Sequence, residues 1–304
     1  MRRSRPVLAA LALAAACRTA PPVPPPAAAA PDVPEPRIAL VLGGWAARGF
    51  AHIGVIRVLE QELIPVDLVV GTSVGSLIGA IYASDKDSFE LEWTAFQLEK
   101  DDLFDFGLVN AVMGMGYARG EKLEAFVKAR VKQPTIEQLE IPFAAVATDL
   151  NWGERVVLDR GPVARAVRAS SAIPGVFEPV MHQGKLLVDG GVVDNIAVDV
   201  AREKGADLVV AVDISENVGN VNIRNMIDVM IQATNIMFEK NVEQLRGRAD
   251  VLVTPKVGDV GTLDFTQKKR CMTAGIEAGR KAVPAIRKAI EEWKRKKAAG
   301  LGRS

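Results

Sequence analysis

The chain has 304 residues, enough for one large or two small domains with a buried core. Its 38 Lys and Arg residues against 37 Asp and Glu residues leave a formal net charge of +1, so no overall basic field exists to hold a nucleic-acid backbone. Hydrophobic residues make up 49% and charged residues 25% of the chain, which is typical of a globular α/β or α+β body and excludes a disordered or polytopic membrane chain.

The first 17 residues have the form of a bacterial export signal. Basic residues precede the apolar run Val7–Ala16, which is shorter than the ~20 residues that span a bilayer. Small residues before Cys17 resemble the lipobox of bacterial lipoproteins, in which that cysteine becomes the lipidated N-terminus. An ordinary signal peptide with an incidental cysteine is the alternative. We therefore expect an exported, lipid-anchored envelope protein, at the outer membrane or the periplasmic face, without a transmembrane helix in the mature chain.

Residues 18–36 form a linker rich in Pro and Ala, because eight prolines rule out a helix or a strand there. No second Pro- or Gly-rich linker follows, so residues 37–293 are expected to form one domain. Residues 294–304 form a basic tail, whose charges are solvated or touch anionic lipid headgroups.

Strand and helix patterns alternate from residue 37 onward. Ile38–Leu42 and Val66–Val70 are short continuous apolar runs that end in glycine, as expected of strands buried on both faces of a parallel sheet. Helical patterns follow them over Phe50–Leu63 and Ser76–Ala83. Two βα units in succession predict a three-layer α/β/α fold with a central, mostly parallel sheet.

Further segments continue both patterns along the chain. The additional strands are predicted over Phe143–Thr148, Arg155–Leu158, Leu186–Val188, Leu208–Val212 and Val251–Val253. The additional helices are predicted over Glu121–Val131, Val163–Ser170, Val198–Lys204, Met226–Leu245 and Lys268–Trp293.

The segment Gly71–Gly75 matches the pattern G-x-S-x-G between a predicted strand and a predicted helix. A serine on such a tight turn presents its hydroxyl above the edge of the sheet, and the helix N-terminus favours negative charge nearby. Ser73 is therefore the candidate nucleophile. A tight turn without chemistry is the alternative interpretation.

A second glycine turn, Gly43–Gly49, follows the first strand. Its free backbone amides can form an anion hole, and Arg48 adds a positive charge. A nucleotide-binding loop is not indicated, because Trp45 and Ala46 interrupt the glycine pattern that such loops require.

Asp189 follows a short apolar strand and precedes two glycines. At the edge of a sheet its carboxylate can take a proton from Ser73 and act as the general base, although Asp-Gly more commonly marks a turn. The chain has two histidines, His52 and His182, and two cysteines, Cys17 and Cys271. This scarcity excludes a disulfide framework and a His- or Cys-rich metal centre, so we expect no metal and no cofactor.

Four segments in this order closely resemble the bacterial patatin-like phospholipases. They are Leu42–Gly54 (LGGWAARGFAHIG), Gly71–Gly79 (GTSVGSLIG), Ser170–Val180 (SSAIPGVFEPV) and Val188–Asn195 (VDGGVVDN), and the resemblance spans residues 37–212. It implies a metal-free Ser-Asp dyad that hydrolyses acyl esters of lipids, with Ser73 as nucleophile and Asp189 as base. We expect neither histidine to be catalytic: His52 packs or caps a helix, and His182 lies in a turn.

The resemblance places oxyanion stabilisation on Gly44, Trp45, Ala46 and Arg48. Trp45 departs from the family, which usually has a glycine there with more backbone freedom and no side chain. The Trp45 amide remains a donor if the indole turns away from the site. The loss of one oxyanion donor would cost on the order of 10²–10³ in rate.

The sequence thus predicts a serine hydrolase that cleaves phospholipid or lysophospholipid esters at a membrane surface through an acyl-enzyme. The alternatives are a weak or inactive lipid-binding lipoprotein with Trp45 in its oxyanion turn, a lipid acyltransferase and a structural envelope protein. Leu103–Val109 with Met113 and Met115 forms either an apolar flap over the site or part of the core. No nucleic-acid or nucleotide partner is expected, and protein partners are not indicated.

Overall fold

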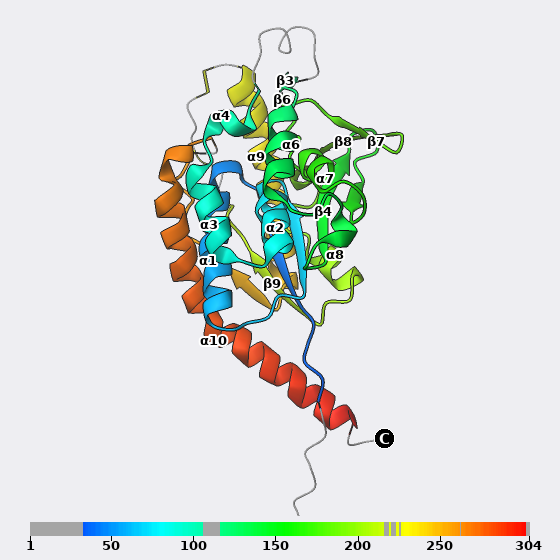
Figure 1. Ribbon diagram of the computed structural model, residues 1–304, viewed down its shortest axis with the longest axis vertical. Coiled ribbons are helices and arrows are strands. Elements are labelled where there is room, and N and C mark those ends of the chain that lie inside the picture. The colour runs from blue at the N-terminus through cyan, green and yellow to red at the C-terminus, as the bar shows by residue number, and fades with distance from the viewer. Residues whose placement is uncertain are drawn as a thin grey trace, which may run out of the picture. The chain divides into compact units, whose positions relative to one another are not determined.

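A mixed, mostly parallel sheet lies at the centre of the protein (Figure 1). The computed structural model describes residues 33–105, 116–215, 219, 223–224, 226–261 and 263–301. The main sheet has the order β10-β9-β1-β2-β4-β8-β7, with β5 paired to β4. Its strands are β1 (Ile38–Leu42), β2 (Leu68–Thr72), β4 (Phe143–Asp149), β5 (Arg155–Leu158), β7 (Val180–His182), β8 (Lys185–Asp189), β9 (Leu208–Val212) and β10 (Val251–Val253). A small second sheet pairs β3 (Gly116–Ala118) with β6 (Gly175–Phe177).

Helices cover both faces of the main sheet. They are α1 (Phe50–Gln61), α2 (Val74–Asp85), α3 (Ser88–Gln97), α4 (Lys100–Leu103), α6 (Glu121–Arg130), α7 (Val163–Ser170), α8 (Val198–Glu203), α9 (Met226–Leu245) and α10 (Lys268–Leu301). Along β1, Leu40 and Leu42 belong to the core beneath α1, α2 and α10, whereas Ala39 and Val41 belong to a separate core beneath α8. Figure 1 shows α1 lying along α10 and α3. The predicted three-layer α/β/α fold is therefore confirmed.

The predicted strands and helices correspond closely to those observed. β1, β5, β9, β10, α7 and α9 have the predicted bounds, and β2 runs from Leu68 into the nucleophile turn at Thr72. Among the helices and strands that the structure describes, five were not anticipated: α3, α4, β3, β6 and β7. Residues 294–297, expected in a basic tail, instead lie within α10, where Lys294 pairs with Glu35 at 2.7 Å.

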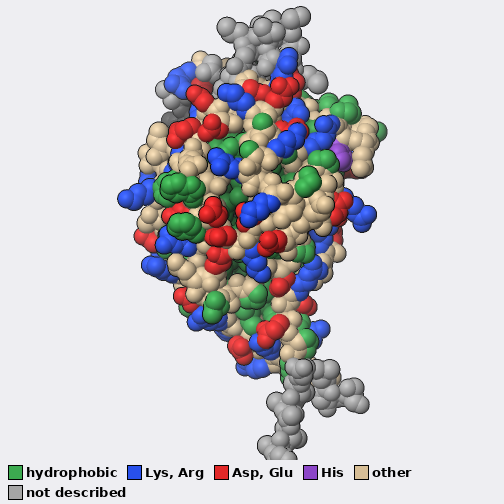
Figure 2. Space-filling view, in the orientation of Figure 1, with side chains coloured by type: hydrophobic (Ala, Val, Ile, Leu, Met, Phe, Trp, Pro, Cys, Tyr) green, Lys and Arg blue, Asp and Glu red, His purple; other side chains and the backbone are tan. Residues whose placement is uncertain are grey.

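Charges of both signs are interspersed on the face shown in Figure 2, as the net charge of +1 suggests. Within the described ranges no helix is long and apolar enough to cross a membrane. The predicted signal peptide, most of the predicted linker and residues 106–115 of the predicted flap lie outside the described residues.

Candidate active site

Ser73 is the single residue between β2 and α2. Its backbone has φ 54° and ψ −126°, a left-handed conformation that is strained for a residue with a side chain and is often found at functional sites. The Ser73 amide donates to Oγ of Ser170 at 2.9 Å, and the Ser76 hydroxyl donates to the Ser73 carbonyl at 2.6 Å. The Ser73 side chain makes no helix-capping bond, so its hydroxyl is available for chemistry.

The two glycines of this turn are required by close backbone packing. A Cβ on Gly75 would lie 2.1 Å from the carbonyl oxygen of Leu42, and one on Gly71 would lie 2.5 Å from the carbonyl oxygen of Gly75. Real Cβ atoms do not approach other atoms this closely. The G-x-S-x-G pattern therefore reflects the space needed to fold the chain sharply between β2 and α2.

Asp189 reaches the same region from the end of β8. Thr72, which precedes the nucleophile, is level with Val146 on β4, and Asp189 is level with the next residue of that strand, Ala147. The Thr148 hydroxyl donates to the carbonyl of Asp189 at 2.9 Å and fixes the end of β8. The shared strand β4 thus brings the predicted nucleophile and base together although 116 positions separate them in sequence (189 − 73).

Burial raises the pKa of Asp189 from its ordinary value of 3.8 to about 7, and the Ser73 hydroxyl and the Gly191 amide offset part of the rise. Oδ1 of Asp189 accepts from the Gly191 amide at 2.8 Å. Oδ2 is buried and meets no donor at hydrogen-bonding geometry within the described residues. The Ser73 hydroxyl lies near the Asp189 carboxyl, in a contact looser than a formed hydrogen bond. Such catalytic contacts commonly tighten when substrate binds.

The turn after β1 lies directly against the nucleophile. A Cβ on Gly44 would be 2.9 Å from Cβ of Ser73, so only glycine allows this approach. The Gly44 amide donates to Oδ1 of Asn195 at 3.0 Å. The amides of Trp45 and Ala46 have no acceptor in the part of the chain that the structure describes.

The side chains of Trp45 and Arg48 are held by partners other than Ser73. The indole of Trp45 packs edge-on against Phe238 of α9, with ring centroids 5.7 Å apart. The Arg48 guanidinium is buried, and it donates to the carbonyls of Val260 at 2.7 Å and Gly258 at 2.9 Å. Of the four residues predicted for oxyanion stabilisation, Trp45 and Ala46 therefore retain available amides. Gly44 and Arg48 are engaged in bonds that hold the turn.

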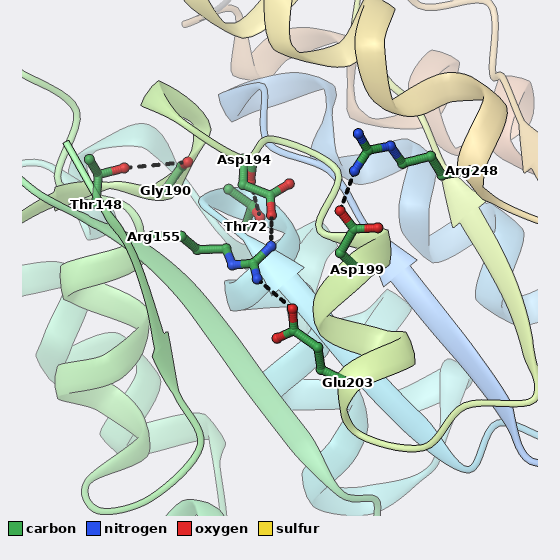
Figure 3. Close-up of polar contacts among 8 residues, drawn as sticks. All are labelled: Thr72, Thr148, Arg155, Gly190, Asp194, Asp199, Glu203 and Arg248. Atoms are coloured by element: carbon green, nitrogen blue, oxygen red, sulfur yellow. Dashed lines mark hydrogen bonds and ion pairs between the residues drawn. The ribbon is translucent and has the colours of Figure 1, made fainter.

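The loop after Asp189 is bound by side chains from β2 and β5, as Figure 3 shows. The Thr72 hydroxyl donates to the Asp194 carbonyl at 3.1 Å, and the Arg155 guanidinium binds the Asp194 carboxylate at 2.9 Å. Burial raises the pKa of Asp194, and the contact with the Arg155 guanidinium offsets part of this rise. The next residue, Asn195, holds Gly44. One short loop thus connects the predicted base to the predicted oxyanion turn.

The two histidines lie outside the pair formed by Ser73 and Asp189. His52 is fully buried, its Nε2 lies 2.8 Å from the Gly43 carbonyl, and burial lowers its pKa to about 4. It is therefore neutral near pH 7, with Nε2 assigned as the donor. His182 ends β7. Neither histidine hydrogen-bonds to Ser73 or Asp189 within the described residues.

A largely apolar cavity opens beside Ser73. We call it the acyl cavity, and it encloses about 550 Å³ of empty space, part of which is open to solvent. Its walls come from α1, α2, α4, α6 and the segment before β6, and they include Phe50, Ser73, Leu77, Leu103, Phe104 and Phe177. Leu103 and Phe104 belong to the predicted flap and are buried here. No group of three or more His, Cys, Asp or Glu side chains that could hold a metal ion occurs in the described ranges.

Comparison with known proteins identifies the family. A model described as patatin-like phospholipase matches residues 40–202, more than half of the 304-residue chain. The chain therefore belongs to the patatin-like phospholipase family. The crystal structure of VipD from Legionella pneumophila has a TM-score of 0.57 at 15% identity, covering 83% of this chain and 67% of that one, which is a likeness of fold alone.

Curated relatives match somewhat more than half of the chain. An uncharacterized NTE family protein of Mycobacterium tuberculosis is 39% identical over 181 residues, covering 60% of this chain and 50% of that protein. The lysophospholipase NTE1 of Mycosarcoma maydis is 38% identical over 179 residues, covering 58% of this chain and 10% of that protein. The chain thus spans half or less of the length of these relatives.

Proposed function

We propose that the protein is a serine acyl hydrolase that cleaves carboxylic esters of phospholipids or lysophospholipids through a Ser73–Asp189 dyad. The observation that carries this proposal is a buried carboxyl with a pKa of about 7, next to a strained serine beside an apolar cavity. Membership of the patatin-like phospholipase family and the similarity to a fungal lysophospholipase support a lipid ester as the substrate class.

In the first half of the reaction, the Ser73 hydroxyl oxygen attacks the ester carbonyl carbon while the Asp189 carboxylate accepts its proton. The amides of Trp45 and Ala46 stabilise the oxyanion, and the N-terminus of α2 adds a favourable dipole. The tetrahedral intermediate then collapses: the bond to the leaving alcohol breaks, and Asp189 returns the proton to that alcohol. The product is an ester between the fatty acid and Ser73.

In the second half, a water molecule attacks the acyl-serine carbonyl and Asp189 accepts a proton from that water. The bond to Ser73 Oγ breaks, Oγ regains the proton from Asp189, and the fatty acid leaves. A pKa near 7 suits both roles, because the carboxyl must be a base in one step and an acid in the next at the same pH.

The position of the Trp45 side chain favours a working site over a purely lipid-binding protein. The indole packs against Phe238, and the backbone amides of Trp45 and Ala46 have no acceptor within the described residues. An acyltransferase would share the first half of the reaction and differ in passing the acyl group to an alcohol.

The test uses purified protein with phospholipid and lysophospholipid dispersions, and mass spectrometry of the released products. We expect free fatty acid from the wild type and none above background from Ser73→Ala. Equal release by wild type and Ser73→Ala would refute the proposal. Transfer of the acyl group to an added alcohol in preference to water would favour the acyltransferase.

We also propose that the protein is exported and anchored to the bacterial envelope by lipidation of Cys17, a proposal that rests on the sequence of residues 1–17. Cells that express the protein are grown with an alkyne-tagged palmitate, which acylates lipoproteins. We expect a labelled membrane-bound protein, and loss of the label in Cys17→Ala. Retention of label in that variant would contradict the proposal.

A further inference from the structure

The helix α3 carries three exposed aromatic side chains, Phe89, Trp93 and Phe96, which we call the aromatic stripe. Their exposed fractions are 72%, 57% and 44%. Helix positions i, i+4 and i+7 lie on one face, whereas Leu91 and Ala95 lie on the opposite face and are buried. Figure 2 shows hydrophobic side chains together on the surface over α3. The helix thus presents apolar surface to solvent as well as to the core.

Polar contacts fix α3 to the body of the protein. The Asp87 carboxylate caps its first turn. Arg57 of α1 binds Glu92 at 3.0 Å, and the Lys268 ammonium donates to the Phe96 carbonyl at 3.2 Å. Because these contacts and the buried face hold the helix in place, the aromatic stripe is not needed to fix it. Contiguous exposed apolar side chains of this kind mark interaction sites.

The aromatic stripe leads to the acyl cavity. Leu98, which follows Phe96 by two residues, lines that cavity together with Ser73. Leu103 at the end of α4 and Phe104 directly after it line the cavity as well. A surface that contacts the stripe therefore lies against the helix whose end forms part of the cavity wall beside the nucleophile.

The area of the aromatic stripe falls short of a stable protein interface. An aromatic side chain offers ~150–250 Å², so at their exposed fractions the three side chains together offer roughly 350 Å². A stable interface buries about 800 Å² on each partner, more than half of it apolar. A lipid surface does not require such an area, because aromatic side chains are favoured at the boundary between headgroups and acyl chains.

The charges around the aromatic stripe indicate which lipid surface fits. The exposed charged side chains of residues 86–102 are mostly acidic: Asp87, Glu90, Glu99, Asp101 and Asp102 stand against Lys86. An anionic lipid surface attracts basic segments and repels acidic ones. The stripe and its surroundings therefore suit a lipid surface without net charge.

We propose that α3 docks the protein on a lipid surface without net charge, through Phe89, Trp93 and Phe96, and thereby brings the acyl cavity to its substrate. The choice of a lipid as the partner rests on the proposed function. The docking surface itself is separate from the Ser73–Asp189 dyad, so that binding and hydrolysis are tested independently.

The binding test uses the full chain and vesicles of pure phosphatidylcholine, with bound protein separated by flotation. All proteins carry Cys17→Ala and Ser73→Ala, so that neither an acyl anchor nor turnover contributes. We expect Trp93→Ser to weaken binding at least about tenfold, because about 55 Å² of inserted apolar surface corresponds to that factor. Phe89→Ser should act in the same direction. Trp152→Ser is the matched control, because Trp152 is 79% exposed in the turn between β4 and β5, and it should leave binding unchanged.

Three results would overturn the inference. The first is equal binding by Trp93→Ser and its parent, or the same loss in Trp152→Ser. The second is binding that rises when anionic lipid is added to the vesicles and disappears at high salt, because a basic surface would then hold the protein. The third is self-association of the parent in sedimentation that is lost in Trp93→Ser, because the aromatic stripe would then join two copies of the chain.

Kinetics separate this inference from the proposed reaction. With Ser73 restored, Trp93→Ser should raise the apparent KM for vesicle lipid about tenfold and leave kcat/KM for a dissolved short-chain ester unchanged. Weaker vesicle binding in Trp93→Ser without hydrolysis by the wild type would leave the inference standing and overturn the proposed function. Equal kinetics of wild type and Trp93→Ser on vesicles would overturn the inference and leave the proposed function standing.

Discussion

Replacing Asp189 with asparagine should stabilise the protein while it removes activity. A carboxyl with a folded-state pKa of about 7 and an ordinary value of 3.8 is more readily protonated in the folded chain than in the unfolded chain. Between about pH 4 and pH 7 the folded protein therefore binds more protons, and its stability falls as the pH rises. Above about pH 7 this loss is complete and no longer changes.

The size of the effect follows from the pKa rise. Each pKa unit corresponds to about 1.36 kcal/mol, so a rise from 3.8 to about 7 costs roughly 4 kcal/mol of folding free energy at high pH. At pH 5 only the first part of this loss has taken effect, roughly 1 kcal/mol. Asparagine does not titrate. The stability advantage of Asp189→Asn should therefore grow by about 3 kcal/mol between pH 5 and pH 8.

Urea unfolding of wild type and Asp189→Asn at both pH values measures this difference, provided that the two proteins have equal m-values. A stability difference that does not depend on pH would refute the assignment of a raised pKa to Asp189. The same pKa predicts that kcat/KM of the wild type falls tenfold per pH unit below about pH 6. His52→Asn is the control, because His52 has a pKa of about 4 and should leave this profile unchanged.

Three further changes test the surrounding contacts. Asn195→Ala leaves the Gly44 amide without its acceptor, and the loss of such a bond costs about 1–3 kcal/mol. We therefore expect kcat to fall about 10- to 100-fold and to recover in Asn195→Asp. An unchanged kcat would contradict this expectation. Arg155→Met should destabilise the fold by about 2–3 kcal/mol in urea unfolding. This is less than the ~3–5 kcal/mol lost when a fully buried ion pair is broken, because the Arg155 side chain is 28% exposed. Equal stability of the variant and the wild type would show that Asp194 needs no partner. Leu77→Trp fills part of the acyl cavity and should shorten the preferred acyl chain. In a series of esters of increasing chain length, kcat/KM should fall about fourfold for each methylene that no longer fits. An unchanged chain-length profile would place the acyl group elsewhere.

The sequence predicted the central elements well because their patterns are strong. β1 and β9 are continuous apolar runs, and such runs are typical of strands that are covered by helices on both faces. α3 was missed because its apolar residues lie on two faces. Phe89, Trp93 and Phe96 are exposed while Leu91 is buried, so no single helical stripe stands out. Figure 2 shows hydrophobic side chains gathered on the surface over this helix.

The end of α10 was placed too early for a different reason. The apolar pattern weakens after Trp293, but Lys, Arg and Ala are good helix formers and no glycine occurs before Gly300. The helix therefore continues to Leu301, although residues 294–300 have no buried stripe. The sequence predicts a turn at His182, whereas the structure has the short strand β7 there, whose three residues lie beside Gly184.

The sequence indicated Ser73 and Asp189 because both stand next to glycines at strand ends, where sheet edges expose side chains. It gave no role to Asn195, although this residue holds Gly44 across 151 positions of sequence. An asparagine after a turn has no local pattern that indicates such a contact. The direction of Arg48 was equally hidden, because a loop sequence does not fix whether a long side chain points into the site or toward the carbonyls of Gly258 and Val260.

The most direct test of the central claim is labelling with a fluorophosphonate, which reacts covalently with activated serines. Wild type, Ser73→Ala and Asp189→Asn are labelled across pH 5–9, and the modified peptide is identified by mass spectrometry. The Ser73–Asp189 dyad predicts that the wild type is modified at Ser73, at a rate that falls below about pH 7, and that labelling is lost in both variants. Modification of another serine, or equal labelling of Asp189→Asn and wild type, would contradict the dyad.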